Sequence, residues 1–365
     1  MTLEEFFSEW NNDSERMLVH TSGSTGKPKP MWVEKRRMLN SARITCDFLG
    51  LQPGDTALLC MSLDYIAGKM MVVRSIERQL KLISVKPSGH PLKDVRDGIT
   101  FAAMVPMQVY NSLQVPEERE RLSRIKHLII GGGAIDDALA SELSKMSEEF
   151  RQKYGYENAI WSTYGMTETL SHIALRRING PDASEWYQPF DSVKISQTDE
   201  GCLVIDAPLV CAEPLVTNDI VEIKACPNQQ VDMPNKDAYI YNKVEAPTKN
   251  VLFRIKGRKD NVICSGGIKI QIEEVEALLN PHLKKPFMIA KKKDEKFGEI
   301  AVLLTEDEDL RAVEATVRRL LSDTSDSEKS KEKSSQKKYW IPRDFIHVNH
   351  LPLTETGKPK RSCLE

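Results

Sequence analysis

Apolar and polar positions alternate in blocks through the first half of this chain of 365 residues. Short apolar runs bounded by polar residues are typical of buried strands, and they lie at 56–61, 80–85, 99–105, 127–130 and 159–163. Two longer mixed segments, 66–76 and 136–150, have the composition of helices. Strands that alternate with helices predict a layered α/β domain.

The pattern changes after about Ile178. Residues 186–255 contain short strand-like pieces with Pro, Asn and Asp between them, which predicts a small β section attached to the α/β core. Near Asp260 the chain becomes lysine-rich, and Glu273–Leu279 has the apolar spacing of one helix face. We therefore predict a large domain over residues 1–260, with its β section from about 186, and a small α+β domain over residues 261–365.

Residues 322–338 are rich in serine and lysine and contain almost no apolar side chain. Such a segment cannot bury enough surface to offset the entropy lost on ordering. It predicts a mobile surface loop, and the interleaved Asp and Glu disfavour the alternative of a nucleic-acid-binding tail.

Composition and charge exclude several other classes. The formal net charge is −2, which gives no general reason to expect nucleic acid as a partner. No apolar run approaches the roughly 20 residues of a membrane span, and the acidic N-terminus does not resemble a signal peptide. The seven cysteines form no CxxC pair, and the histidines lack the spacing of a zinc site. We expect a cytoplasmic protein with free thiols.

The densest chemical signal is the segment TSGSTGKPK at residues 21–29. Its glycines allow close backbone approach to an anion, its hydroxyls and N–H groups donate hydrogen bonds, and its lysines add positive charge. This combination suits a polyphosphate. A Walker A loop is excluded because Lys27 is followed by Pro28, and a flexible Ser/Gly/Pro turn is the alternative.

These residues also match, at every fixed position, the signature [ST]SG[ST]TGxPK of the adenylate-forming superfamily, which includes acyl-CoA synthetases, luciferases and the adenylation domains of peptide synthetases. Further segments resemble that superfamily in the same order along the chain: YGMTE at 164–168, TND at 217–219, GRKD at 257–260, SGG at 265–267 and LPLTETGK at 351–358. The resemblance implies the layered adenylate-forming-enzyme α/β fold with a small mobile α+β C-terminal domain.

The resemblance also implies ATP and Mg²⁺ as ligands, and a role for each segment. The catalytic residues would be Lys358, Thr167 and Glu168, with Glu168 binding the metal. The residues that would bind ATP are Thr21, Ser22, Gly23, Ser24, Thr25, Gly26, Lys27, Gly133, Ala134, Ile135, Tyr164, Asp219 and Arg258. The alternatives are a core tyrosine for Tyr164, a solvated acid for Glu168, a surface ion pair for Asp219 with Arg258, and an exposed lysine for Lys358.

The second half of such a reaction implies coenzyme A as co-substrate. In the superfamily the C-terminal domain rotates between the two steps, and Asp260 would be the hinge residue. The glycine turn formed by Ser265, Gly266 and Gly267 would then face the coenzyme A thiol.

Residues 61–74 are similar to the segment LPLFHxSGxxxxxR of o-succinylbenzoate–CoA ligases of menaquinone biosynthesis, although Asp64-Tyr65 replace the usual Phe-His. That substrate keeps one free carboxylate after the other is activated. Lys69, Arg74 and His172 are the candidates to bind it. The alternative is that Lys69 and Arg74 lie on a helix surface exposed to water.

The chain departs from the superfamily pattern in three places. Only 20 residues precede Thr21, so we interpret the N-terminal subdomain as shortened, and a homodimer is one way to compensate. Asn218 stands where the superfamily has glycine, and Ile272 where it has proline. Besides the two-step carboxylate–CoA ligase, an enzyme that loads a carrier protein and a non-catalytic nucleotide sensor stay open as alternatives.

Overall fold

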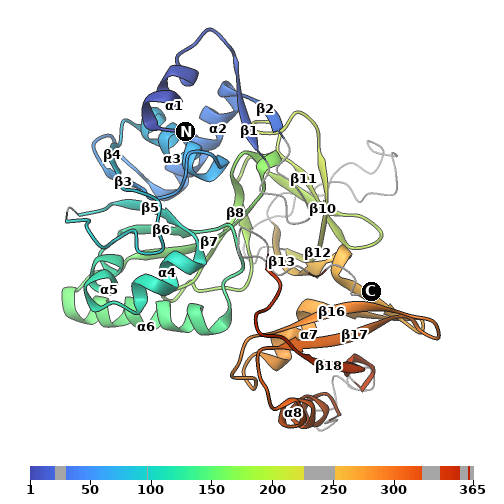
Figure 1. Cartoon of the computed structure of the whole chain (residues 1–365). Coiled ribbons are helices and arrows are strands. Elements are labelled where there is room, and N and C mark those ends of the chain that lie inside the picture. Colours follow the sequence, from blue (N-terminus) through green and yellow to red (C-terminus); the bar gives the residue numbers. More distant parts are fainter. Residues whose placement is uncertain (21–29, 97, 226–250, 323–337, 354–360, 362–365) are drawn as a thin grey trace. The chain divides into compact units, whose positions relative to one another are not determined.

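The computed structural model describes residues 1–20, 30–96, 98–225, 251–322, 338–353 and 361 (Figure 1). They divide into two compact units. The first comprises residues 1–198, 204–216 and 223–254, and the second comprises 199–203, 217–222 and 255–365.

A seven-stranded sheet forms the centre of the first unit. Its strand order is β4-β3-β5-β6-β7-β8-β9, and the neighbours from β4 to β7 pair in parallel whereas β8 and β9 are antiparallel. The strands are β3 (Thr56–Leu59), β4 (Lys81–Ser84), β5 (Phe101–Met104), β6 (His127–Ile130), β7 (Ala159–Gly165), β8 (His172–Arg177) and β9 (Gln188–Pro189).

Helices cover both faces of the parallel part of this sheet. Helices α2 and α3 lie on one side and α4, α5 and α6 on the other (Figure 1). Along β6, Leu128 and Ile130 join the core beneath α4 to α6, while Ile129 is buried on the opposite side. Burial on both faces explains why these strands are continuous apolar runs. The helices of this unit are α1 (Leu3–Trp10), α2 (Lys35–Leu49), α3 (Ile66–Arg78), α4 (Pro106–Leu113), α5 (Pro116–Ser123) and α6 (Asp137–Tyr154).

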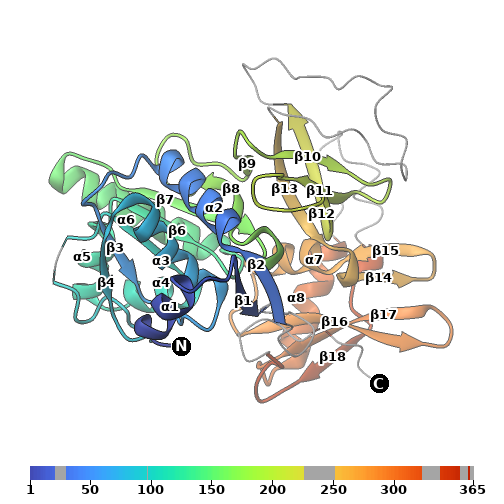
Figure 2. The ribbon, with the colours of Figure 1, turned by 90° about the horizontal axis from the view of Figure 1, so that it is seen from above.

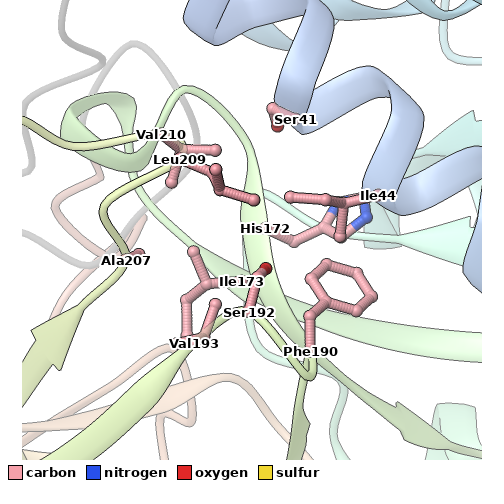
Figure 3. Close-up of a pocket in the computed structure, with 10 residues that line it drawn as sticks. All are labelled: Ser41, Ile44, His172, Ile173, Phe190, Ser192, Val193, Ala207, Leu209 and Val210. Atoms are coloured by element: carbon pink, nitrogen blue, oxygen red, sulfur yellow. The ribbon is translucent and has the colours of Figure 1, made fainter.

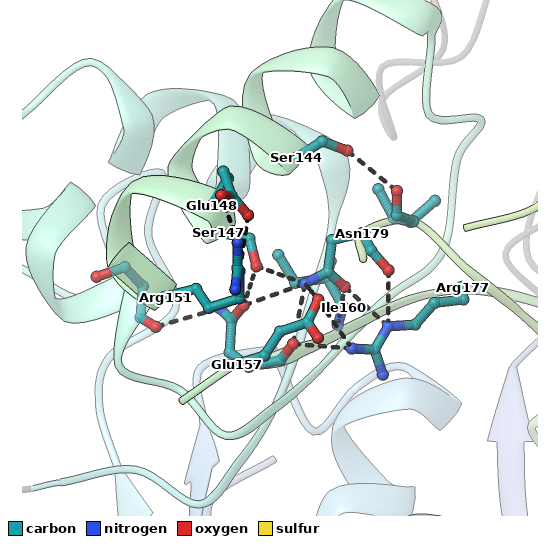
Figure 4. A network of polar contacts seen from close by, with 11 residues as sticks. Ser144, Ser147, Glu148, Arg151, Glu157, Ile160, Arg177 and Asn179 are labelled. Atoms are coloured by element: carbon teal, nitrogen blue, oxygen red, sulfur yellow. Dashed lines mark hydrogen bonds and ion pairs between the residues drawn. The ribbon is translucent and has the colours of Figure 1, made fainter. Parts of the chain in front are cut away.

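A network of buried hydrogen bonds connects α6 with the β7–β8 pair (Figure 4). The Asn179 side-chain amide donates to the Asn158 backbone carbonyl at 2.9 Å and to Ser147 Oγ, and its oxygen accepts from the Ile160 N–H at 2.9 Å. Arg177 donates to the Asn158 and Asn179 carbonyls. Because every member has a partner, the network fixes the geometry of these elements without leaving an orphaned polar group.

Two smaller sheets complete this part of the chain. Strands β1 (Arg16–His20) and β2 (Pro30–Glu34) pair antiparallel and flank residues 21–29 on both sides. A four-stranded sheet has the order β10-β11-β12-β13. Its strands are β10 (Lys194–Gln197), β11 (Cys202–Asp206), β12 (Leu215–Ala225) and β13 (Val251–Arg258).

The second unit contains a five-stranded sheet with the order β15-β14-β17-β16 and β18 beside β17. Helices α7 and α8 lie on one face of this sheet (Figure 2). They pack there around Ile263, Val275 and Val317, and a second apolar cluster around Met288 and Val302 lies on the other face. The elements are β14 (Val262–Ser265), β15 (Ile268–Gln271), α7 (Ile272–Leu279), β16 (Phe287–Asp294), β17 (Gly298–Thr305), α8 (Leu310–Ser322) and β18 (Asp344–His347). In the described part of the chain, 3₁₀ turns occur in the first unit at η1 (Thr167–Thr169) and in the second unit at η2 (Lys259–Asn261) and η3 (Lys338–Trp340).

The α/β fold class is confirmed, and the predicted strands and helices of the first half are present with shifts of a few residues at their ends. The main segment of the second unit begins at Ile255. The unit also includes residues 199–203 and 217–222, so it is not identical with the domain predicted over 261–365. The predicted loop at 322–338 lies almost entirely outside the described residues. Among the described helices, none combines the length and apolar content needed to cross a membrane.

Candidate active site

The ends of three neighbouring parallel strands form the frame of the site. Strands β5, β6 and β7 pair in parallel, so the segments that follow them emerge at the same edge of the sheet. These segments begin at Val105, Gly131 and Met166. Ligands of open α/β sheets bind at this edge, beyond the carboxyl ends of the strands.

The segment after β6 approaches its neighbours closely. A Cβ atom on Gly131 would lie 2.4 Å from Thr163 Oγ1 on β7, and Gly132 has a φ of +79°. Both positions therefore favour glycine. Beyond them Gly133 and Ala134 are exposed and Ile135 is buried. This places the predicted adenine-binding segment at the same sheet edge as the YGMTE segment, and its contact with adenine stays a prediction.

The YGMTE segment makes a tight turn between β7 and β8. A Cβ atom on Gly165 would lie 2.3 Å from the Ser171 carbonyl oxygen, so only glycine fits there without displacement. The Thr169 hydroxyl closes the turn with a 2.6 Å hydrogen bond to that same carbonyl. Thr167 is largely buried in the turn, whereas Glu168 is exposed. An exposed carboxylate at the sheet edge is available to a ligand that arrives from solvent.

Tyr164 lies just before this turn, at the end of β7. Its ring packs edge-on against Phe253 with centroids 5.2 Å apart, and Tyr187 lies at 6.0 Å. The ring is 7% exposed. The residue therefore belongs to an aromatic cluster of the first unit, and stacking on adenine stays a prediction.

Arg74 lies at the start of a buried chain of hydrogen bonds. The guanidinium of this α3 residue is 2% exposed and donates to Ser171 Oγ, and its Nε atom is buried without a hydrogen-bond partner among the described residues. Burial lowers the pKa of Arg74 to about 10. The described residues supply no carboxylate to this cation, which is a costly arrangement unless an anion binds there.

His172 continues the chain from Ser171. Its Nδ1 lies 3.2 Å from Ser171 Oγ and its Nε2 lies 3.0 Å from Thr45 Oγ1. Thr45 donates its own proton to the Ser41 carbonyl, so Nε2–H must donate to Thr45 and Nδ1 must accept from Ser171. Burial, and then the charge of Arg74, hold the pKa of His172 well below its usual range. The imidazole is therefore neutral.

A small pocket adjoins His172 (Figure 3). The side chains of Ser41 and Ile44 on α2 face those of His172, Phe190 and Leu209 across it. The rings of His172 and Phe190 have centroids 5.6 Å apart. The pocket combines apolar walls with hydroxyl and imidazole groups, and it has room for about one water molecule.

Lys69 is also buried, at 3% exposure, but its ammonium group has a backbone partner. Lys69 Nζ donates to the Leu18 carbonyl on β1 at 3.0 Å. Burial lowers the pKa of Lys69. The alternative that Lys69 and Arg74 lie on a helix surface exposed to water is wrong, because both side chains are buried in the first unit. The polar bonds of Lys69 connect α3 to the strand that precedes residues 21–29.

In the second unit, the predicted hinge residue Asp260 accepts a hydrogen bond from Arg258 at 2.9 Å. The backbone N–H of Asp219 donates to Thr217 Oγ1 at 3.1 Å. The glycine turn predicted to face coenzyme A joins β14 to β15, and Gly266 and Gly267 have φ of +55° and +83°. The turn geometry therefore accounts for both glycines.

Part of the predicted site lies outside the described residues. This applies to the whole phosphate-binding segment Thr21–Lys29 and to Lys358, so their roles stay predictions. Ser171 and Thr45 were not predicted as site residues. Ser171 lies close after the YGMTE segment, which could have indicated it, whereas the sequence around Thr45 gave no such signal.

Glu168 is the predicted Mg²⁺ ligand. In the described part of the chain no three His, Cys, Asp or Glu side chains gather into a metal-binding group. Mg²⁺ that is held mainly by phosphate oxygens needs only one or two protein carboxylates. The single exposed Glu168 fits such a metal, which would arrive with the nucleotide.

Comparison with known proteins agrees with this geometry. Residues 5–207, more than half of the chain, match the AMP-binding enzyme family. The 2-succinylbenzoate–CoA ligase of Salmonella typhimurium is 24% identical over 306 residues, which cover 81% of this chain and 59% of that protein. The D-alanine–D-alanyl carrier protein ligase of Lactiplantibacillus plantarum is also 24% identical, covering 95% of this chain and 70% of that protein. The chain thus spans about three fifths of the length of the succinylbenzoate relative.

Solved structures give the same fold. An acyl-CoA synthetase (AMP-forming)/AMP-acid ligase II-like protein from Dyadobacter fermentans superposes with a TM-score of 0.57 at 29% identity, covering 98% of this chain and 91% of that one. The o-succinylbenzoate coenzyme A synthetase of Bacillus subtilis, in complex with ATP and magnesium ion, gives a TM-score of 0.63 at 20% identity, covering 94% of this chain and 68% of that one.

Proposed function

Because this chain belongs to the AMP-binding enzyme family, we propose that it is an ATP-dependent carboxylate–CoA ligase that acts through an acyl-adenylate. In the first step a carboxylate oxygen attacks the α-phosphorus of ATP and pyrophosphate leaves. In the second step the thiol of coenzyme A attacks the acyl carbon and AMP leaves. The products are the thioester, AMP and pyrophosphate.

In the first step, different residues of this chain would bind each part of ATP and stabilise the transition state. Thr21–Lys27 would bind the β- and γ-phosphates, the Gly133–Ile135 segment and Tyr164 the adenine, and Asp219 with Arg258 the ribose. Thr167 would donate to the α-phosphate and Glu168 would hold Mg²⁺. Lys358 would place a cation against the negative charge that develops on the phosphate in the transition state, where it accelerates the reaction most.

We propose o-succinylbenzoate as the acid. The observation that carries this choice is the buried Arg74, whose guanidinium has no carboxylate partner among the described residues and an unsatisfied Nε. A carboxylate left free on the substrate would satisfy it with a charge-assisted hydrogen bond. Arg74 contacts Ser171, only three residues beyond Glu168, so the proposed acid-binding and metal-binding groups lie on one turn. His172 would maintain the orientation of Ser171.

The experiment is coupled AMP release with Mg-ATP, coenzyme A and o-succinylbenzoate, run beside benzoate and medium-chain fatty acids. Release that requires both o-succinylbenzoate and coenzyme A is the expected result. Release with another acid alone would retain the ligase and remove the substrate assignment. No release with any acid, in protein that still binds ATP, would favour a nucleotide sensor.

A second candidate is an enzyme that loads an amino or acyl group onto a carrier protein. The similarity to the D-alanine–D-alanyl carrier protein ligase, which covers 95% of this chain, supports it. The two functions differ in the acceptor of the second step. Adenylate formation that persists while coenzyme A fails to accept the acyl group would favour the carrier.

A further inference from the structure

Residues 258–260, at the predicted hinge, form hydrogen bonds with side chains from other parts of the second unit. Lys259 Nζ donates to Glu200 Oε2 at 2.5 Å, and Asn218 Nδ2 donates to Asp260 Oδ2 at 3.3 Å. Glu200 lies in the turn between β10 and β11 and Asn218 lies on β12. The same Asp260 oxygen also accepts from Arg258 at 2.9 Å.

Two backbone carbonyl groups at the predicted hinge also accept hydrogen bonds from side chains. Gln271 Nε2 donates to the Arg258 carbonyl at 3.1 Å, and Lys291 Nζ donates to the Asp260 carbonyl at 3.0 Å. The two donors lie on β15 and β16, which follow the hinge in the chain, whereas Glu200 and Asn218 precede it. Side chains from before and from after the hinge therefore contact η2.

The chemistry of the Glu200 and Asn218 contacts makes them reversible. All four side chains of the two contacts are substantially exposed, and Lys259 and Glu200 are 48% and 63% exposed. Exposed pairs of this kind are weak and are screened by salt. Asn218 is also the position where the chain departs from the superfamily glycine, which has no side chain to make this bond.

We propose that Glu200 and Asn218 form a clamp on residues 258–260 that holds the hinge turn in one conformation and slows its rearrangement between the two half-reactions. The part of this inference that concerns the half-reactions rests on the proposed ligase function. The part that concerns the turn itself does not, because it requires only that the two contacts restrain η2.

The Val262 amide reports on the turn, because its N–H donates to the Lys259 carbonyl. Hydrogen exchange of this amide should be about 1.4- to fivefold faster in Glu200→Gln and in Asn218→Ala, the range expected when a weak exposed contact is lost. In the wild type, exchange should accelerate with added salt, and Glu200→Gln should reduce that dependence. The matched control is Glu314→Gln, which removes an exposed pair with Arg318 on α8 of the same unit.

A charge exchange separates a clamp from a general loss of structure. Glu200→Lys should accelerate exchange, and the double variant Glu200→Lys/Lys259→Glu should return it toward the wild-type rate. Adenylate formation by pyrophosphate exchange and thioester formation from supplied acyl-adenylate are then measured in the same proteins. The ratio of the two rates should shift in the same direction in each loosened variant and return in the double variant.

Unchanged Val262 exchange in the folded single variants would overturn the clamp, and so would a double variant as fast as Glu200→Lys. Faster exchange with an unaltered ratio of half-reactions would overturn its effect on turnover. If no acid supports turnover, hydrogen exchange still decides whether the clamp exists, and it is the proposed ligase function that fails.

Discussion

At the scale of single residues, the neutral state of His172 follows first from its burial and then from the charge of Arg74. Each ring nitrogen lies within hydrogen-bond distance of a hydroxyl group, Nδ1 of Ser171 and Nε2 of Thr45. A protonated ring would also place a second positive charge beside the buried Arg74. The fold therefore disfavours protonation of this histidine.

This arrangement predicts a pH dependence of stability. The folded-state pKa of His172 lies well below its ordinary value of 6.5, so below pH 6.5 the unfolded chain binds a proton that the folded chain does not. The stabilisation is complete above pH 6.5 and is lost as the pH falls toward the folded-state pKa, by up to about 1.4 kcal/mol per pH unit. Urea unfolding between pH 7.5 and 5.5 should show a smaller loss in His172→Gln than in the wild type. Equal losses would contradict the assignment.

Arg74 is the residue proposed to distinguish a diacid from a simple acid. Arg74→Lys keeps the charge but loses the planar donor set, so we expect the KM for o-succinylbenzoate to rise about 10- to 100-fold, as for the loss of a charged hydrogen bond. The KM for ATP should stay within about twofold of the wild type, as for a substitution that leaves the nucleotide contacts in place. The matched control is Arg78→Lys on the same helix, because Arg78 binds the Leu51 carbonyl and Asp47 instead. A parallel rise in both KM values would show that Arg74 acts through folding alone.

At the scale of elements, α3 contacts the segment before it too closely for a side chain at Gly68. A Cβ atom there would lie 2.2 Å from the Ser62 carbonyl oxygen. Gly68→Ala should therefore lower the free energy of unfolding by about 1–3 kcal/mol, as for other overpacked sites. Gly98→Ala is the control, since nothing lies within 4 Å of its Cβ position, and it should change stability by less than about 0.5 kcal/mol. Equal effects in urea unfolding would refute the steric argument.

The sequence predicted the strands of the parallel sheet well because both of their faces are buried. The run at 127–130 is β6 with the same limits, and 66–76 is most of α3. It could not predict that Lys69 and Arg74 are buried, because the partners of both lie far away in the chain, in Leu18 and Ser171. Charged residues in a short helix are more often exposed. The contact of Asn218 with Asp260 was hidden for the same reason, since it joins residues 42 positions apart.

The YGMTE motif predicted the position of the site but not the packing around it. Its order and position predicted a site after a strand, and it does follow β7 at the edge of the parallel sheet. The need for glycine at 165 is a matter of backbone packing against Ser171, which no single sequence displays. His172 was a candidate for the acid-binding group from the sequence, whereas Ser171 became one only once its contact with Arg74 was known.

At the scale of the whole molecule, the chain combines an α/β unit that carries the adenine and metal-binding candidates with a smaller unit that carries the predicted hinge and the glycine turn. The chain spans 59% of the length of its succinylbenzoate relative. A homodimer stays a prediction. The central claim for the molecule is that the acid is activated as an adenylate.

Oxygen transfer tests that claim most directly. With o-succinylbenzoate labelled with ¹⁸O in its carboxylates, attack on the α-phosphorus leaves one labelled oxygen on the phosphate of AMP after the thioester has formed. Mass spectrometry of the nucleotide after turnover with Mg-ATP and coenzyme A should therefore find AMP that carries a single ¹⁸O. Unlabelled AMP, or label in inorganic phosphate with ADP as the product, would contradict the account.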